Sequence, residues 1–171
     1  MRTNFTEEQL KNPEINESNK ILRNCVHCGF CLPTCPTYDL LGDERDSPRG
    51  RIYMIQGMLE SKNSPEPESV RHIDRCLSCL GCLTACPSGV DYMHLIDNAR
   101  SHIEDHYHRP WHQRLVRSWI AYVFPRPHLF RIILLITSYL RFLSIFLPSF
   151  LRRTVSLIPK KIESPSPLNS H

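Results

Sequence analysis

Hydrophobic residues recur with the spacing of α-helices through the first part of the chain. Ser47 and Pro48 are typical of a helix start, where an N-cap residue is followed by proline at the first helical position. Ile52, Ile55 and Leu59, which follow, would then share one helix face. No alternating run of the kind that marks a strand occurs before Pro110, so the pattern predicts a mainly α fold. The other predicted helices are residues 14–24, a short segment that carries Val70 and Ile73, and residues 91–108.

The pattern changes at Pro110, which ends the helix predicted for residues 91–108. Residues 111–128 are rich in aromatic and basic side chains. In residues 129–147, the most apolar stretch, Leu, Ile and Phe supply 13 of 19 residues. The chain is therefore expected to have four parts. These are a flexible N-terminus over residues 1–13, an α-helical domain over residues 14–109, a basic and apolar helical extension over residues 110–154, and a disordered tail over residues 155–171.

The apolar stretch 129–147 has three interpretations. On a helix, Arg131 and Arg141 fall on the same side as the hydroxyl residues and leave a wide apolar face. Such a helix favours packing against a partner protein. A position in the membrane interface, with access to a membrane quinone, is the second interpretation. A transmembrane span is the least favoured, because a sided helix is poorly suited to full lipid exposure.

Composition narrows the class of protein. The sequence starts without the basic and apolar segments of a secretory signal, so we expect the cytoplasm, with peripheral contact to the inner face of the cytoplasmic membrane as an option. There the eight cysteines stay reduced and favour metal ligation over disulfides. The usual glycine-rich phosphate loops are absent.

Basic residues number 11 against 14 acidic in residues 1–100, and 10 against 3 in residues 101–171. The basic part contains no nucleic-acid module, so no nucleic acid is expected as a partner.

All eight cysteines fall in two blocks with the spacing C-x2-C-x2-C-x3-C-P, offset by 51 residues. In bacterial ferredoxins this spacing lets three thiolates hold one [4Fe–4S] cluster while the fourth cysteine of the block reaches the other cluster. Two such clusters form a path for electrons and require no catalytic residue, so the flavin chemistry would lie on another polypeptide. The predicted ligand sets are Cys25, Cys28, Cys31 and Cys86 for the first cluster, and Cys76, Cys79, Cys82 and Cys35 for the second.

The alternative for these cysteines is a binding module held by two zinc ions. It is disfavoured because zinc sites usually pair two C-x2-C units across a longer loop. His102, His106 and His108 also suggest a metal site, but a solvated helix face is favoured, since two histidines four residues apart are a weak motif. For His27, inside the first block, two roles stay open: tuning a cluster or acting as a spacer.

Beyond the cysteines, residues 22–60 and 72–100 resemble the family of bacterial glycolate oxidase iron–sulfur subunits. The resemblance covers about residues 14–128 and implies an all-helical ferredoxin domain that carries electrons for FAD-containing subunits oxidising glycolate to glyoxylate. Related flavin oxidoreductases of the lactate, glycerol-3-phosphate or heterodisulfide type are the alternative. Family members are more than twice as long and continue into Cys-Cys-Gly domains, whereas this sequence has no cysteine after Cys86. The motifs that carry the resemblance are Gly42-Asp43-Glu44, Ser47-Pro48-Arg49-Gly50-Arg51 and Cys86-Pro87-Ser88-Gly89-Val90.

Arg49 and Arg51 precede or begin the helix between the two blocks, and two roles stay open for them. They could neutralise cluster charge or bind the flavin partner. They could equally be solvated arginines at a capped helix start. The resemblance favours the functional role.

Overall fold

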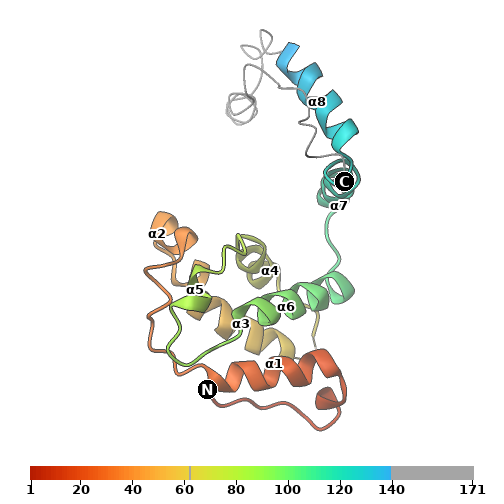
Figure 1. The fold of residues 1–171 in the computed structure, drawn as a ribbon. Helices are drawn as coiled ribbons and strands as arrows, with labels where there is room; N and C mark the ends of the chain where they lie inside the picture. Colours follow the sequence, from red (N-terminus) through yellow and green to blue (C-terminus); the bar gives the residue numbers. More distant parts are fainter. Residues whose placement is uncertain (62, 140–171) are drawn as a thin grey trace, which may run out of the picture. The chain divides into compact units, whose positions relative to one another are not determined.

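The computed structural model describes residues 1–61 and 63–139 of the chain. The chain has two compact units, Met1–His108 and Arg109–His171 (Figure 1). Every regular element in the described ranges is helical, so the predicted mainly α fold is confirmed. The elements of the first unit are η1 (Gln9–Lys11), α1 (Pro13–Asn24), α2 (Pro36–Leu41), η2 (Glu44–Asp46), α3 (Pro48–Glu60), α4 (Pro67–Asp74), α5 (Gly81–Thr84) and α6 (Tyr92–His106).

Helix α6 forms the centre of the first unit and contacts α1, α3 and α4 (Figure 1). The core between these helices consists of apolar side chains that are fully buried, such as Leu22, Ile55, Ile73 and Leu95. Removing each of them from water contributes about 1.5–3 kcal/mol to folding. The apolar face predicted for α3 lies in this core, and α1, α3, α4 and α6 match the four predicted helices.

The starts of the long helices are fixed by side-chain caps. Ser47 Oγ accepts a hydrogen bond from the Gly50 amide at 2.9 Å, and Pro48 follows as the first helical residue, which confirms the predicted start of α3. The side chain of Asn12 caps α1 in the same way, and that of Asp91 caps α6. These local signals determine where each helix begins, and therefore where the loops before it end.

Two short helices, α2 and α5, were not predicted. Each lies at a cysteine block and is too short for a hydrophobic period to show. Cys35 is the N-cap residue of α2 and Pro36 its first residue, so the proline after the fourth cysteine starts a helix here. Gly42 ends α2 in the left-handed conformation, with φ of 65°.

The N-terminal segment, expected to be flexible, contacts the first unit along its length. Thr3 Oγ1 donates to Asn19 Oδ1 at 2.7 Å. Gln9 Nε2 donates to the carbonyl oxygens of Leu59 and Glu60 at 3.0 and 3.2 Å. The first compact unit therefore starts at residue 1 and ends at His108, whereas the sequence suggested a domain over residues 14–109.

Gly50, in the first turn of α3, touches the backbone of η2. A Cβ atom at position 50 would lie 2.0 Å from the carbonyl oxygen of Glu44. Gly50→Ala is therefore expected to destabilise the protein by about 1–3 kcal/mol or more, measured by urea unfolding under anaerobic conditions. Gly57, in the same helix, has nothing within 4 Å of such a Cβ, so Gly57→Ala is the matched control and should stabilise by about 0.5–1 kcal/mol. Equal effects of the two substitutions would contradict this contact.

The described part of the second unit contains α7 (Trp111–Val123) and α8 (Pro127–Tyr139). No single helix among the described residues is long and apolar enough to cross a membrane. Helices α7 and α8 pass that test only as a pair, and they are bent by 111° at the break between them. Within the predicted apolar stretch 129–147, residues 129–139 belong to α8. Residues 140–147, the rest of the predicted extension to 154 and the predicted tail over 155–171 lie outside the described residues.

Candidate functional site

The eight cysteines line two cavities of the first unit. The elements that carry them, α2, α5 and the loops of both blocks, lie together at one end of this unit (Figure 1). The first cavity, about 440 Å³ with its open mouth included, is lined by Cys25, Cys28, Cys31 and Cys86. The second cavity, about 310 Å³ on the same measure, is lined by Cys35, Cys76 and Cys79. Cys82 lines both. The structure thus brings together the cysteines that the ferredoxin spacing assigns to each cluster, including the exchange of the fourth cysteine between blocks.

The loops that carry the first cysteines of each block have a repeated backbone conformation. His27 and Gly29 are left-handed, with φ of 55° and 86°. Their equivalents 51 residues later, Ser78 and Leu80, are left-handed too, with φ of 50° and 60°. Three of these four residues are not glycine, so the conformation is strained and the surrounding structure has to hold it. The internal repeat in the sequence is therefore also a repeat in the backbone.

Two side chains besides Cys82 line both cavities, namely Pro48 and Tyr92. Pro48 is the first residue of α3, and Tyr92 is the first residue of α6. Both side chains are buried, and only 3% of the Tyr92 surface is exposed. Only these shared side chains need to separate the two cavities, so groups bound in them would lie close together.

The cysteines differ in exposure and in the pKa of their thiols. Burial raises the pKa of Cys82 to about 12, and Cys76 beside it adds to the shift. Burial also raises the pKa of Cys31. For Cys35, burial is outweighed by hydrogen bonds from Thr37, from backbone amides and from Arg51, so its pKa is lowered. Cys28 and Cys79 are exposed. A thiolate at Cys82 therefore requires a bound cation or cluster, since the pocket alone disfavours the charged form.

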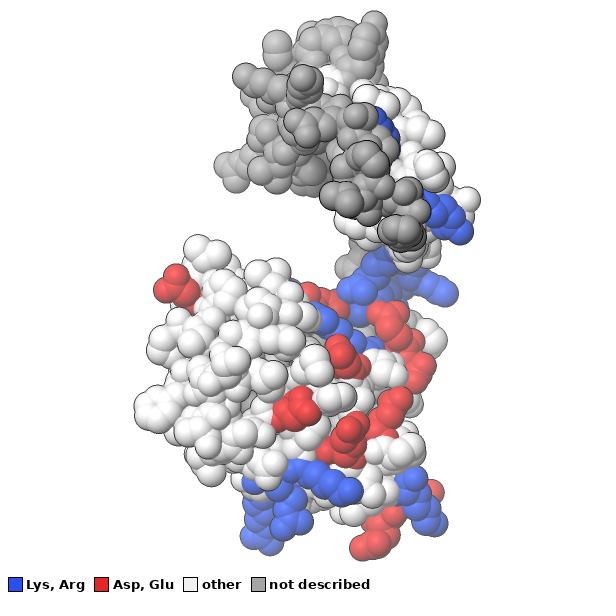
Figure 2. All heavy atoms as spheres, in the orientation of Figure 1, with Lys and Arg blue, Asp and Glu red and all other residues white. Residues whose placement is uncertain are grey.

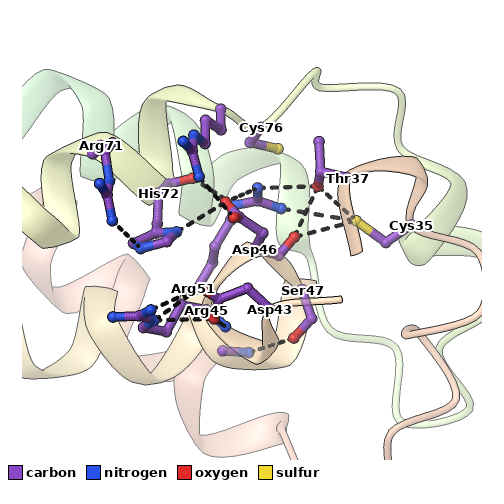
Figure 3. Close-up of polar contacts among 12 residues, drawn as sticks. Cys35, Thr37, Asp43, Arg45, Asp46, Ser47, Arg51, Arg71, His72 and Cys76 are labelled. Atoms are coloured by element: carbon purple, nitrogen blue, oxygen red, sulfur yellow. Dashed lines mark hydrogen bonds and ion pairs between the residues drawn. The ribbon is translucent and has the colours of Figure 1, made fainter. Parts of the chain in front are cut away.

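A buried network of polar side chains lies beside the second cavity (Figure 3). Asp46 is fully buried, and its carboxylate contacts Arg51 at 3.4 Å, His72 Nδ1 at 2.9 Å and Arg75 at 3.0 Å. A carboxylate can only accept, so His72 donates from Nδ1, and its Nε2 then accepts from Arg71 at 3.4 Å. The network ends at Cys35, whose Sγ lies 3.8 Å from an Arg51 nitrogen and 3.1 Å from Thr37 Oγ1.

Arg49 lines the first cavity. Its Nε donates to Glu44 at 2.8 Å, and its NH1 donates to the carbonyl oxygen of His27 at 3.2 Å. The ring of His27 packs against that of Tyr53 in a tilted arrangement, with 4.4 Å between ring centroids, and its Nδ1 is buried without a hydrogen-bond partner among the described residues. Burial lowers the pKa of His27. Arg49 thus braces the loop of the first block, whereas Arg51 lies in the buried network.

The cysteine sulfurs do not lie at the spacing of a preformed zinc site. Around one tetrahedral zinc ion with bonds of about 2.3 Å, the sulfurs would lie roughly 3.8 Å apart. Among the described residues, which include all eight cysteines, the His, Cys, Asp or Glu triad with ligand atoms within 4.8 Å of one another is Asp43, Asp46 and His72. No three cysteine sulfurs come that close, whereas a cluster holds each sulfur on a different iron. The triad is no cation site, because the carboxylates of Asp43 and Asp46 already pair with arginines.

The histidines of α6 form a local surface contact. The rings of His102 and His106 stack with 4.2 Å between centroids, and His106 Nδ1 lies 2.9 Å from the carbonyl oxygen of His102. Burial lowers the pKa of His102, and His106 adds to the shift. His108 follows the helix and is exposed.

Comparison with known proteins identifies the kind of domain that contains the two cavities. Residues 24–91 match the family described as "4Fe-4S dicluster domain". This part of the chain is a 4Fe-4S dicluster domain. It contains all eight cysteines, the number of thiolates that two [4Fe–4S] clusters need, so the predicted cofactors are confirmed.

Relatives of the dicluster domain agree with the resemblance seen in the sequence. The chain is 50% identical to the glycolate oxidase iron–sulfur subunit of Escherichia coli K12 over 131 residues, which is 77% of this chain and 32% of that protein. It is 40% identical to the probable glycolate oxidase iron–sulfur subunit of Bacillus subtilis 168, over 57% of this chain and 22% of that protein. The succinate dehydrogenase iron–sulfur subunit of Coxiella burnetii is 27% identical, over 49% of this chain and 38% of that protein. No solved structure matches the chain significantly. The chain spans about a third of the length of its Escherichia coli relative.

The sequence identified the cysteines of the dicluster domain but not the residues that support them. Asp46, His72 and Thr37 were not singled out, because nothing in their spacing links them to a cysteine block. Tyr92 was missed for the same reason. One signal was available. Arg49 and Arg51 are two residues apart on a helix and do not share a face, so their side chains must contact different parts of the molecule.

Proposed function

We propose that this chain is the electron-transfer part of a complex in which a flavin-containing subunit oxidises glycolate to glyoxylate. One observation carries the proposal: two adjacent cavities, each lined by cysteines, share the walls formed by Pro48, Cys82 and Tyr92. The 50% identity with the Escherichia coli subunit supports glycolate as the electron source. The weaker 28% identity with a heterodisulfide reductase subunit of Methanosarcina acetivorans makes that class the less favoured alternative.

Within this proposal the clusters take the ligand sets that the spacing rule predicts. Cys25, Cys28, Cys31 and Cys86 hold the first cluster, and Cys76, Cys79, Cys82 and Cys35 hold the second. All eight thiols are free of disulfides, as such ligation requires. Bound there, the clusters supply one-electron oxidation and reduction, and two of them match the two electrons that glycolate gives up. The residues of the chain hold the thiolates, keep the centres close together and shield them from water.

The surface around the exposed cysteines suits a protein partner. Val26 and Phe30, on either side of Cys28, are 66% and 65% exposed, and Leu77, beside Cys79, is 67% exposed. Figure 2 shows that this side of the first unit, on the left of the view, is largely free of charged side chains. Apolar surface next to redox centres favours a closely packed contact that excludes water. The flavin subunit is the proposed occupant, with the complex in the cytoplasm or at the inner face of the cytoplasmic membrane.

Glycolate-dependent reduction of the purified complex tests the proposal. The full chain is isolated anaerobically with its natural partners, bound flavin is measured, and EPR spectra are recorded before and after adding glycolate. We expect co-purified FAD and an iron–sulfur signal that glycolate induces.

Lactate and glycerol 3-phosphate at the same concentration are the controls. A signal that appears with one of these substrates but not with glycolate would replace the proposed donor. Absence of any flavin-containing partner would contradict the complex itself.

A further inference from the structure

Hydrogen bonds to cysteine sulfur are distributed unevenly between the two cavities. At the second cavity, Arg51 donates to Cys35 Sγ at 3.8 Å, and the Tyr92 hydroxyl donates to Cys76 Sγ at 3.7 Å. Both donors are side chains, and one of them is charged. At the first cavity the donors are backbone amides: that of Val90 donates to Cys86 Sγ at 3.5 Å, and those of Cys31 and Arg49 donate to the Cys31 thiol.

The charge of Arg51 is both buried and permanent. Its side chain is 1% exposed, and a guanidinium does not lose its proton in proteins. Two further hydrogen bonds fix its direction, from Nε to the carbonyl oxygen of His72 at 2.8 Å and from NH2 to Thr37 Oγ1 at 3.1 Å. Asp46 pairs with Arg51, as Figure 3 shows, and it also pairs with Arg75 at 3.0 Å. Because Asp46 is shared with Arg75, it offsets only part of the positive charge of Arg51, the guanidinium that reaches Cys35.

Arg49 provides a weaker field at the first cavity, although it interacts electrostatically with the Cys31 thiol. Its side chain is 31% exposed and forms an ion pair with Glu44 at 2.8 Å, so water and the carboxylate both weaken its charge. Its remaining hydrogen bond goes to a backbone oxygen, that of His27, and not to a sulfur. The two arginines of the Ser47–Arg51 motif therefore act differently on the two cavities.

This asymmetry has a direct consequence for reduction. An electron adds negative charge to a cluster, and donors and positive charge close to the sulfur ligands stabilise the reduced state, more strongly where water is excluded. We infer that the cluster held by Cys35, Cys76, Cys79 and Cys82 has the higher midpoint potential of the two, and that Arg51 and Tyr92 are the positioning residues that raise it. The inference rests on the ligand sets of the proposed function. Electrons exchanged between the two centres then collect at the second one.

Redox titration of the anaerobically purified full chain tests this inference. Each cluster is followed by EPR during titration with dithionite and mediators, and the variants Cys28→Ser and Cys79→Ser identify which signal belongs to the first and which to the second cluster. In the wild type the second cluster should be reduced first. In Tyr92→Phe, which keeps the buried ring, the ratio of reduced to oxidised second cluster at a fixed potential should fall about tenfold, or 59 mV for a one-electron couple. The first cluster should titrate as before.

Tyr53→Phe is the matched control, because Tyr53 is 59% exposed and lies next to His27 of the first block. It should leave the second cluster unchanged. Arg51→Lys should also lower the midpoint potential of the second cluster. If Arg51→Lys does not fold, Tyr92→Phe alone tests the inference. Reduction of the first cluster before the second, or an unchanged second cluster in Tyr92→Phe, would overturn the inference. If glycolate reduces neither cluster but dithionite gives the expected order, the proposed function fails and this inference stands.

Discussion

Replacing Cys35 with serine should damage the cluster of the other cysteine block. Cys35 belongs to the first block in sequence, but it lines the second cavity with Cys76 and Cys79. Serine is a poor ligand for iron, so the second cluster should be lost or converted while the first remains. Iron should fall from about eight to about four atoms per chain. The EPR signal that disappears should be the one that Cys79→Ser alters.

The reciprocal variant, Cys86→Ser, is the control. Cys86 comes from the second block but lines the first cavity, so its loss should spare the second cluster. If Cys35→Ser instead affects only the cluster of Cys25, Cys28 and Cys31, the crossed ligand sets are wrong. The pair of variants therefore tests the connectivity and not merely the presence of iron.

Asp46→Asn should cost the first unit much of its stability. The substitution removes the negative charge that faces Arg51, which is buried and cannot be neutralised. Breaking a buried ion pair in this way typically costs about 3–5 kcal/mol. For a domain of this size, the thermal unfolding midpoint should fall by roughly 10 °C or more, measured by circular dichroism under anaerobic conditions.

Asp43→Asn is the matched control for this variant. Asp43 lies three residues earlier and pairs with Arg45, but both side chains are partly exposed to water. Exposed ion pairs contribute little to stability, so the midpoint should stay close to that of the wild type. A small effect at Asp46, comparable to that at Asp43, would show that the network does not support the fold.

Local and repeated signals in the sequence predicted much of the site. The spacing of the cysteines gave their grouping into two sets, because the ferredoxin arrangement depends on spacing. The cap at Ser47 gave the start of α3, because an N-cap acts within a few residues. The four longer helices followed from their hydrophobic period.

Contacts between distant residues could not be predicted in this way. Asp46 and His72 are 26 positions apart, and each is an ordinary polar residue in sequence terms. Their pairing depends on how η2 packs against α3 and α4, which is set by tertiary packing. The same holds for the N-terminal segment, where Gln9 donates a hydrogen bond to the carbonyl oxygen of Leu59, fifty residues away. Helices α2 and α5 escaped prediction because they are too short for periodicity.

The measurement that tests the central claim most directly is a count of iron and acid-labile sulfide in the anaerobically purified full chain, with EPR of the dithionite-reduced protein. Two neighbouring clusters predict about eight irons and eight sulfides per chain, and a signal broadened by the interaction of two close spins. Stoichiometric zinc in colourless protein, or a single isolated cluster, would contradict the account.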